Sequence, residues 1–177
     1  MVMTFDGYIS GPNGELDWMM SPDKDRERNA LALIDNVDTA LIGRGVYDDM
    51  ANYWPTASGE FADKYNALPK LVFGDADETL SWSNAKTFVV KDNLAEEVTK
   101  LKQLPGKDMV LYGGVRLAQS FVNLGLVDEY QLTVYPVALG EGRPLFHDLK
   151  GKINLKLIAV EPYASGAMMV RYQTTLY

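Results

Sequence analysis

The chain has 177 residues, of which 47% are hydrophobic and 23% are charged, a globular balance that excludes a disordered chain. A formal net charge of −7 disfavours nucleic acid and anionic membranes as partners. The absence of Cys excludes disulfides and thiolate chemistry and favours a cytoplasmic location. His147 is the only histidine, so a multi-histidine metal site is excluded and no metal is expected.

The sequence contains no recognisable targeting or membrane segment. An acidic residue, Asp6, follows the start closely and no basic stretch precedes it, which excludes a signal peptide. No window approaches the roughly 18 apolar residues that a transmembrane helix needs. The chain opens directly into a strand-like segment, which leaves open whether further residues precede it in the natural protein.

Short apolar runs alternate with helical stretches along the first two-thirds of the chain. Ser21 and Pro22 predict the start of a helix that continues to about Asn36. Asn93 and Glu96 form a capping-box-like pair at the start of a second helix, and a third follows the Gly-Gly pair at 113–114. Strands are predicted at 39–42, 71–73, 88–90 and 109–112. This alternation predicts a mostly parallel sheet.

The last third alternates with a period of two residues, which indicates antiparallel strands. The predicted strands cover 130–134, 153–157 and 168–174, with a turn at 162–166 between the last two. We therefore expect one α/β domain over residues 1–177, with a mixed, mostly parallel sheet and a C-terminal antiparallel hairpin.

Two glycine-rich junctions between a strand and a helix are candidate anion sites. In the first, a strand delivers Gly113 and Gly114 into a helix start, so that backbone N–H groups and the positive helix end can face one ligand. In the second, Gly43, Arg44 and Gly45 follow another strand. The alternatives are a tight turn and a surface arginine. Ligands of open α/β sheets bind at the carboxyl ends of strands, where both junctions would lie.

The N-terminal segment and a later loop are candidates for a ligand-covering role. The strand-like run at 4–9 leads into Gly11–Gly14 and then to Trp18, an arrangement that suits a lid over a planar ligand. The alternative is an ordinary connection in which Trp18 anchors the core. The glycine-rich loop at 138–146 and the adjacent His147 are expected at the surface.

Acidic residues offer candidates for proton transfer. The candidates are Asp6, Asp17, Asp48 and Asp49. The acidic stretches 60–63 and 75–78 are expected to be solvated.

Taken in order, these motifs resemble the dihydrofolate reductase-like superfamily. They are most similar to the C-terminal reductase domain of bacterial bifunctional riboflavin-biosynthesis deaminase-reductases. The matching segments are 5–9, 16–18, 41–44 with Tyr47, 68–70, 79–80 with Trp82, 112–114, 125–129, 136–140 and 145–146.

The resemblance implies a dihydrofolate reductase-like fold, a homodimer and NADPH as the cofactor. The positions that match its cofactor-binding residues are Gly43, Arg44, Tyr112, Gly113, Gly114, Val115 and Arg116. Asp6, Gly7 and Trp18 match positions beside the nicotinamide and the substrate, and the loop at 140–143 is expected near the mouth of the site.

The sequence departs from the family pattern at two places. Gly74, Asp75 and Asp77 stand where members commonly carry a Ser-Arg-like pair, and a carboxylate there suits a ribose hydroxyl better than a phosphate. NADH is therefore not excluded as the cofactor. No residue matches the helix acid of true dihydrofolate reductases, although Asp25 and Glu27 lie in the corresponding helix.

The residues and the resemblance together predict an NAD(P)H-dependent reductase that transfers hydride to a pyrimidine- or pterin-like molecule. It would resemble 5-amino-6-(5-phosphoribosylamino)uracil reductase. Because the nicotinamide carries the hydride, a chain with one His and no Cys can still be an enzyme. Asp6, Asp17 or an ordered water would donate the proton. The alternatives are a dinucleotide-binding module without turnover and a purely structural domain.

Overall fold

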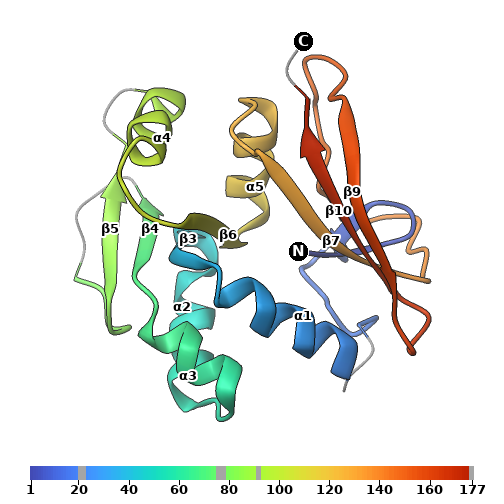
Figure 1. Ribbon diagram of the computed structural model, residues 1–177, viewed down its shortest axis with the longest axis horizontal. Coiled ribbons are helices and arrows are strands. Elements are labelled where there is room, and N and C mark those ends of the chain that lie inside the picture. Colours follow the sequence, from blue (N-terminus) through green and yellow to red (C-terminus); the bar gives the residue numbers. More distant parts are fainter. Residues whose placement is uncertain (20–22, 75–78, 91–92, 176–177) are drawn as a thin grey trace. The chain divides into compact units, whose positions relative to one another are not determined.

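A computed structural model describes residues 1–19, 23–74, 79–90 and 93–175 of the chain. Contacts within the chain divide it into two compact units. The terminal unit comprises residues 1–26 and 119–177, and the central unit comprises residues 27–118. Both are drawn in Figure 1. The expectation of a single domain stays a prediction.

The central unit contains a parallel sheet with the strand order β5-β4-β3-β6. Its strands are β3 (Val37–Gly43), β4 (Lys70–Gly74), β5 (Ala85–Val89) and β6 (Asp108–Gly113). Every neighbouring pair is parallel, which confirms the prediction from the β-α alternation. The helices of this unit are α2 (Arg44–Tyr53), α3 (Glu60–Ala67) and α4 (Leu94–Lys102), with a short 3-10 helix at Trp54–Thr56.

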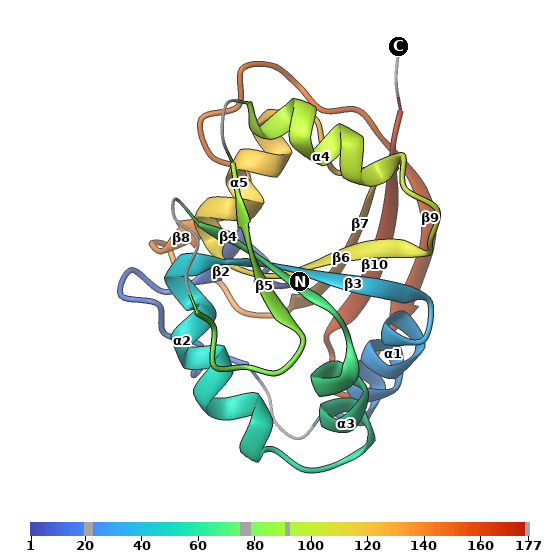
Figure 2. The ribbon, with the colours of Figure 1, turned by 90° about the vertical axis from the view of Figure 1, so that its left-hand side faces the viewer.

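Helices α2 and α3 cover one side of the parallel sheet (Figure 2). The core there combines strand residues such as Ile42 and Val72 with Tyr47 of α2 and Tyr65 of α3, all almost fully buried. The acidic stretch 60–63 forms the first turn of α3, and its carboxylates Glu60 and Asp63 are exposed there, as expected. Carboxylates are favourable at a helix start, and the burial of Tyr65 later in the helix holds this segment against the sheet.

Lys70 lies inside this core with only 1% of its surface exposed. Its ammonium donates to the carbonyl oxygens of Leu68, Asn66 and Ser83 at 2.7, 2.9 and 3.4 Å. The same nitrogen lies 4.5 Å from the centre of the Trp82 ring. Burial lowers the pKa of Lys70 to about 8. The cation thus joins the carbonyl-rich end of α3 to the strand β4.

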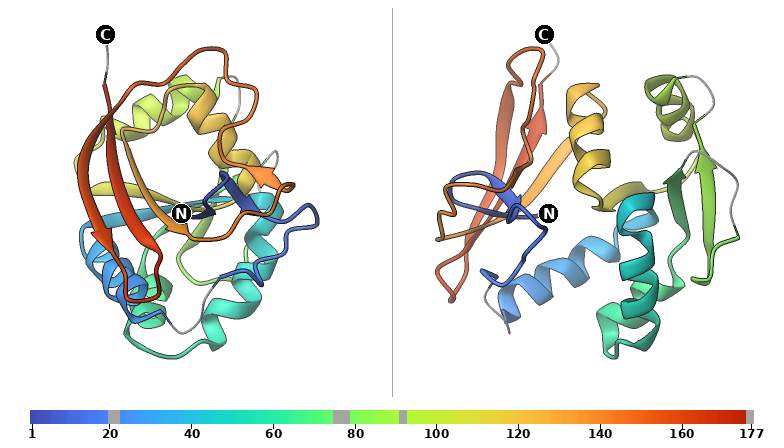
Figure 3. Two further views of the ribbon diagram at one scale, coloured as in Figure 1. Left: turned by 90° about the vertical axis from the view of Figure 1, so that its right-hand side faces the viewer. Right: turned by 180° about the vertical axis from the view of Figure 1, so that it is seen from behind.

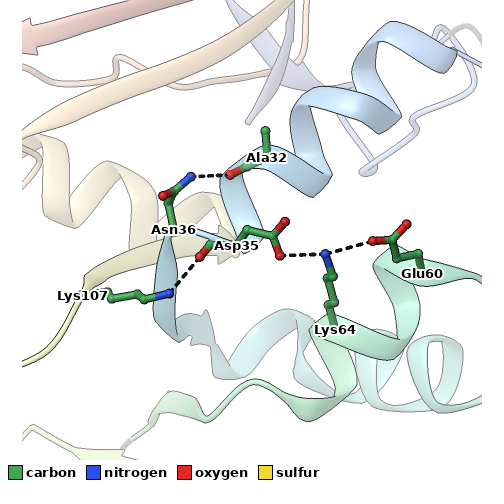
Figure 4. A network of polar contacts seen from close by, with 6 residues as sticks. All are labelled: Ala32, Asp35, Asn36, Glu60, Lys64 and Lys107. Atoms are coloured by element: carbon green, nitrogen blue, oxygen red, sulfur yellow. Dashed lines mark hydrogen bonds and ion pairs between the residues drawn. The ribbon is translucent and has the colours of Figure 1, made fainter.

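A polar network ties elements together near the amino ends of β3 and β6 (Figure 4). Lys64 binds the carboxylates of Asp35 and Glu60 at 2.7 and 2.9 Å, and Lys107 donates to the Asp35 carbonyl at 2.9 Å. The Lys107 N–H also donates to Asp38 at 2.6 Å. These contacts hold the starts of the two strands in register, at the opposite end from their carboxyl termini.

The terminal unit contains a four-stranded sheet in the order β1-β7-β10-β9 and the two-stranded pair β2-β8. Its strands are β1 (Val2–Thr4), β2 (Tyr8–Ser10), β7 (Glu129–Tyr135), β8 (Arg143–Pro144), β9 (Leu155–Pro162) and β10 (Met168–Thr174). The predicted C-terminal hairpin is confirmed as β9–β10 and is visible in Figure 3. It pairs with β7, and this sheet is separate from the parallel one.

The remaining helices are α1 (Lys24–Ile34) and α5 (Val115–Asn123). Both were predicted, although Ser21 and Pro22 lie outside the described residues. Asn93 caps α4 as expected, since its side chain accepts the Ala95 N–H at 3.0 Å. Within the described ranges, no helix is both long and apolar enough to span a membrane.

Candidate functional site

Glycines end three neighbouring strands at the carboxyl edge of the parallel sheet. Gly74 ends β4, Gly43 ends β3 and Gly113 ends β6. Because these strands are parallel and adjacent, their carboxyl ends meet at the same edge. The helices α2 and α5 start directly beyond the second and third of these strands. The two predicted glycine junctions therefore lie side by side.

The backbones of Gly43 and Gly114 touch. A Cβ added at Gly114 would lie 3.1 Å from the Gly43 Cα, and one added at Gly43 would lie 3.3 Å from the Leu117 Cβ. Gly114 also has a φ of +103°, which residues with a side chain rarely adopt. Both glycines are therefore required by the close approach of two strand–helix junctions.

A β-bulge shapes the end of β6. Leu41 pairs with Leu111 but Ile42 pairs with Gly113, so Tyr112 is the extra residue. The Tyr112 ring packs into the core, with its centre 4.6 Å from that of Tyr65. Only the backbone of Tyr112 is thereby placed at the strand end, so its predicted cofactor contact would be a main-chain contact.

Each of the two helices begins with a glycine that provides no side-chain cap. Gly43 is the N-cap of α2 and offers no side-chain acceptor. In α5, the first helical bond runs from the Ala118 N–H to the Gly114 carbonyl at 2.9 Å. The first turn of α5, which contains Val115 and Arg116, therefore lies at this edge with its N-terminal end. The dipoles of the two helices make this edge favourable for an anion.

Arg44 lies at the same edge with about a third of its side chain exposed (36%). Its Nη1 is 3.0 Å from Asp48 Oδ2, and the guanidinium carbon is 5.4 Å from the centre of the Tyr47 ring. The stem of the side chain runs past Gly74, within 3.9 Å of the position that a Cβ would take there. The acidic residues Asp75 and Asp77, which bear on the choice between NADPH and NADH, lie outside the described residues.

In the terminal unit, Asp6 and Gly7 form the turn between β1 and β2. Gly7 has a φ of +92°. The Asp6 carboxylate accepts the Thr4 hydroxyl at 2.6 Å and the Gly140 N–H at 2.8 Å. These contacts, the Thr4 hydroxyl first, lower the pKa of Asp6. Asp6 is therefore held as a carboxylate and has no proton to donate at neutral pH.

A cavity of about 250 Å³ brings other predicted residues together in this unit. It is lined by Gly11, Pro12, Glu15, Asp17, Trp18, Leu139 and Glu141. Trp18 also packs edge-on against Tyr135, with ring centres 5.8 Å apart, and belongs to the edge of the unit's core. Trp18 therefore packs against the core, as one of the two alternatives expected, and also lines the cavity, while its role in a lid stays a prediction.

The loop at Gly11–Gly14, beside this cavity, is tied to β8. The Arg143 Nε donates to the Pro12 carbonyl at 3.2 Å. Within the loop, the Gly14 N–H donates to the Gly11 carbonyl at 3.1 Å, and Glu15 accepts the Asn13 N–H at 2.9 Å. The expected lid is thus a hydrogen-bonded turn in this structure. His147 lies at the surface as predicted, with Nε2 3.1 Å from Asp148.

Asp23 is a buried carboxylate that the sequence analysis did not single out. It is 3% exposed and accepts the Ser165 hydroxyl at 2.8 Å and the Tyr135 hydroxyl at 3.4 Å. It also accepts the Arg26 N–H at 3.1 Å, as a helix N-cap does, while the Nε of Arg26 is buried without a partner. Its position directly after Ser21 and Pro22 was a sequence signal for a cap, but burial depends on residues far along the chain.

The predicted cofactor residues all belong to the central unit, and Asp6, Gly7, Asp17 and Trp18 all belong to the terminal unit. A comparison with known families covers nearly the whole chain: residues 1–169 match the RibD C-terminal domain. The chain belongs to the RibD C-terminal domain family.

Relatives of this RibD C-terminal domain protein include both stand-alone and longer chains. It is 41% identical to the uncharacterized protein YyaP of Bacillus subtilis (strain 168), covering 97% of this chain and 91% of YyaP. It is 30% identical to the riboflavin biosynthesis protein RibD of Corynebacterium ammoniagenes, covering 84% of this chain but only 46% of that protein.

Solved structures show the same fold. A crystal structure of a protein assigned to riboflavin biosynthesis in Shewanella sp. PV-4 has a TM-score of 0.79 and 25% identity, covering 99% of this chain and 97% of that one. Dihydrofolate reductase from Enterococcus faecalis, complexed with NADP(H), has a TM-score of 0.63 and 15% identity, covering 98% and 93% of the two chains. This second likeness concerns the fold alone and confirms the expected dihydrofolate reductase-like class.

Proposed function

We propose that this protein is an NAD(P)H-dependent reductase that transfers hydride to a pyrimidine- or pterin-like molecule. The observation that carries the proposal is the contact between Gly43 and Gly114, which brings two helix N-termini to one edge of the parallel sheet. Membership of the RibD C-terminal domain family supports the same reaction class. A reaction of the 5-amino-6-(5-phosphoribosylamino)uracil reductase type is the family precedent.

The carboxyl edge of the parallel sheet fits the phosphates of a dinucleotide. First-turn N–H groups at Val115 and Arg116 would donate to the pyrophosphate, and the absence of a side chain at Gly114 leaves the backbone accessible. The Arg44 guanidinium would bind a 2′-phosphate after exchanging its contact with Asp48. When bound, the nicotinamide would supply the hydride.

The cavity beside Trp18 supports a planar, uncharged or amino-bearing substrate. The indole offers an aromatic wall, and the carboxylates of Glu15, Asp17 and Glu141 line the same space. A phosphate group would be repelled by these carboxylates, whereas ring amino groups would find hydrogen-bond acceptors. Asp17 lines the cavity and is our candidate proton donor, with an ordered water as the alternative.

Titration decides whether the protein binds a cofactor. Addition of NADPH or NADH should change the fluorescence of Trp54 and Trp82, both in the central unit. Absence of binding of either at millimolar concentration would reject the proposal. Turnover is then measured as NADPH oxidation with 5-amino-6-(5-phosphoribosylamino)uracil, its dephosphorylated ribosyl form and 7,8-dihydrofolate. We expect the phosphate-free pyrimidine to be preferred over its phosphorylated form.

Cofactor binding without oxidation of NADPH on any of these compounds would favour the alternative, a dinucleotide-binding module without turnover. We also propose that the protein acts in the cytoplasm as a homodimer. Light scattering of the purified chain tests the dimer, since a monomer mass at micromolar concentration would reject it.

A further inference from the structure

Asp6 joins two segments of the terminal unit that are far apart in the sequence. Its Oδ2 accepts the N–H of Gly140, 134 residues further along the chain. Its Oδ1 accepts the Thr4 hydroxyl, and this hydroxyl in turn accepts the Tyr8 N–H at 3.0 Å. Because Thr4 is fully buried, the carboxylate is held in a fixed orientation from its own side of the contact.

The loop after β7 is fastened to the β1–β2 turn at several points around this carboxylate. The Phe5 N–H donates to the Val137 carbonyl at 2.8 Å, and the Tyr8 hydroxyl donates to the Gly140 carbonyl at 3.3 Å. Gly140 has a φ of +77°, a conformation that residues with a side chain rarely adopt. Asp6 thus binds the backbone N–H of Gly140 at the bend of the loop.

The two residues that flank Gly140 line the cavity, whereas Asp6 does not. Leu139 and Glu141 face the same space as Asp17 and Trp18. A loop whose central N–H is fixed presents both neighbours in a defined place. Without the carboxylate, Gly140 would gain backbone freedom, and this wall of the cavity would lose its position.

We propose that Asp6 is a positioning residue, which shapes the substrate cavity by anchoring the loop at Gly140 rather than by donating a proton. A general acid works best when its pKa is near the operating pH. The hydrogen bonds that Asp6 accepts shift its pKa in the opposite direction. The assignment of a substrate effect rests on the proposed reductase function, whereas the anchoring itself does not.

Asp6→Ala and Asp6→Asn separate the two roles. Asparagine keeps one acceptor oxygen for the Gly140 N–H and can donate its amide to the Thr4 hydroxyl oxygen, so it preserves the anchor but not an acid. Alanine removes both. Asp63→Ala is the control, because Asp63 is an exposed carboxylate in the first turn of α3 in the central unit.

The first readout is amide hydrogen exchange of residues 137–142, which needs no turnover. We expect exchange at least tenfold faster in Asp6→Ala, close to wild type in Asp6→Asn and unchanged in Asp63→Ala. Unchanged exchange in Asp6→Ala would overturn the anchor. If the wild type oxidises no NADPH with the compounds above, the proposed function fails while this readout still decides the anchor.

The second readout is whether each substitution changes KM or kcat for the phosphate-free pyrimidine. Asp6→Ala should raise KM at least fivefold with kcat within threefold of wild type, and Asp6→Asn should restore KM to within threefold. A loss of kcat by more than tenfold in both variants, with KM unchanged, would instead identify Asp6 as the proton donor and overturn the proposal.

Discussion

Replacing Gly114 with alanine should destabilise the central unit, because the added methyl group is unfavourable for two separate reasons. A φ of +103° disfavours any residue with a Cβ by roughly 1–2 kcal/mol. The new Cβ would also lie 3.1 Å from the Gly43 Cα and 3.3 Å from the Gly43 N. Such overpacking costs about 1–3 kcal/mol, since the neighbouring atoms are backbone and cannot rotate away.

The two costs together amount to roughly 3 kcal/mol, which corresponds to a fall in melting temperature of about 6–12 °C for a protein of this size. Gly45→Ala is the matched control, because nothing lies within 4 Å of its added Cβ and the residue is in α2. Alanine there should stabilise the helix by about 0.5–1 kcal/mol.

Urea unfolding followed by the fluorescence of Trp54 and Trp82 measures both changes in the central unit. A midpoint that falls for Gly114→Ala and rises for Gly45→Ala supports the reasoning, provided that the slope with denaturant stays constant. A loss below about 0.5 kcal/mol for Gly114→Ala would refute both the backbone strain at Gly114 and its contact with Gly43, because strain alone should exceed that value.

Three further predictions follow from single residues. Arg44→Ala should weaken NADPH binding about tenfold or more and NADH binding far less, because one charge-assisted bond to the 2′-phosphate is lost. Arg171→Ala, in the terminal unit, is the control for the titration. If Arg44→Ala weakened the binding of both cofactors equally, the assignment of Arg44 to the 2′-phosphate would be contradicted. Burial lowers the Lys70 pKa from 10.5 to about 8, so between those pH values the unfolded chain holds a proton that the folded one has released. The free energy of unfolding should therefore rise by up to roughly 3 kcal/mol as pH increases through this window. Chemical denaturation at a series of pH values measures this rise in the wild type and in Lys70→Met, which lacks the titrating group. If the free energy of unfolding changed with pH in the same way in both proteins, the prediction would be wrong. The pKa of Asp6 is lowered in the folded protein, so its stabilising contacts are fully present above its unfolded pKa of 3.8 and are lost as pH falls through the lower folded pKa. In an acid titration monitored by circular dichroism, Asp6→Asn should therefore lose less stability below pH 3.8 than the wild type does.

Local patterns predicted most of the elements. The apolar run before Gly43 forms β3, the capping residue Asn93 starts α4, and the alternating residues near the C-terminus form a hairpin. In these cases the determining interactions lie within a few residues, so the sequence carries them directly. Helix α3 was missed because its acidic first turn resembles a solvated loop, and only the burial of Tyr65 distinguishes the two.

Polar residues were harder to interpret than apolar ones. Lys70 in the core and Asp23 beneath Ser165 would both be surface residues by type, since charged side chains are seldom fully buried. Their burial depends on partners that the chain folds around them, namely several carbonyl oxygens for the lysine and two hydroxyl groups for the aspartate.

By itself, the acidic, Cys-free sequence with a single histidine determined the α/β class, the places of its glycines and the family resemblance. The tertiary structure decided what those glycines do, because only the pairing of β3 with β6 brings Gly43 against Gly114. It also decided the role that Asp6 can play. A carboxylate in a turn is a candidate acid until its partner is known, and that partner, the Gly140 N–H, lies 134 residues away. Contacts at such separation depend on the whole fold, which local sequence patterns do not encode.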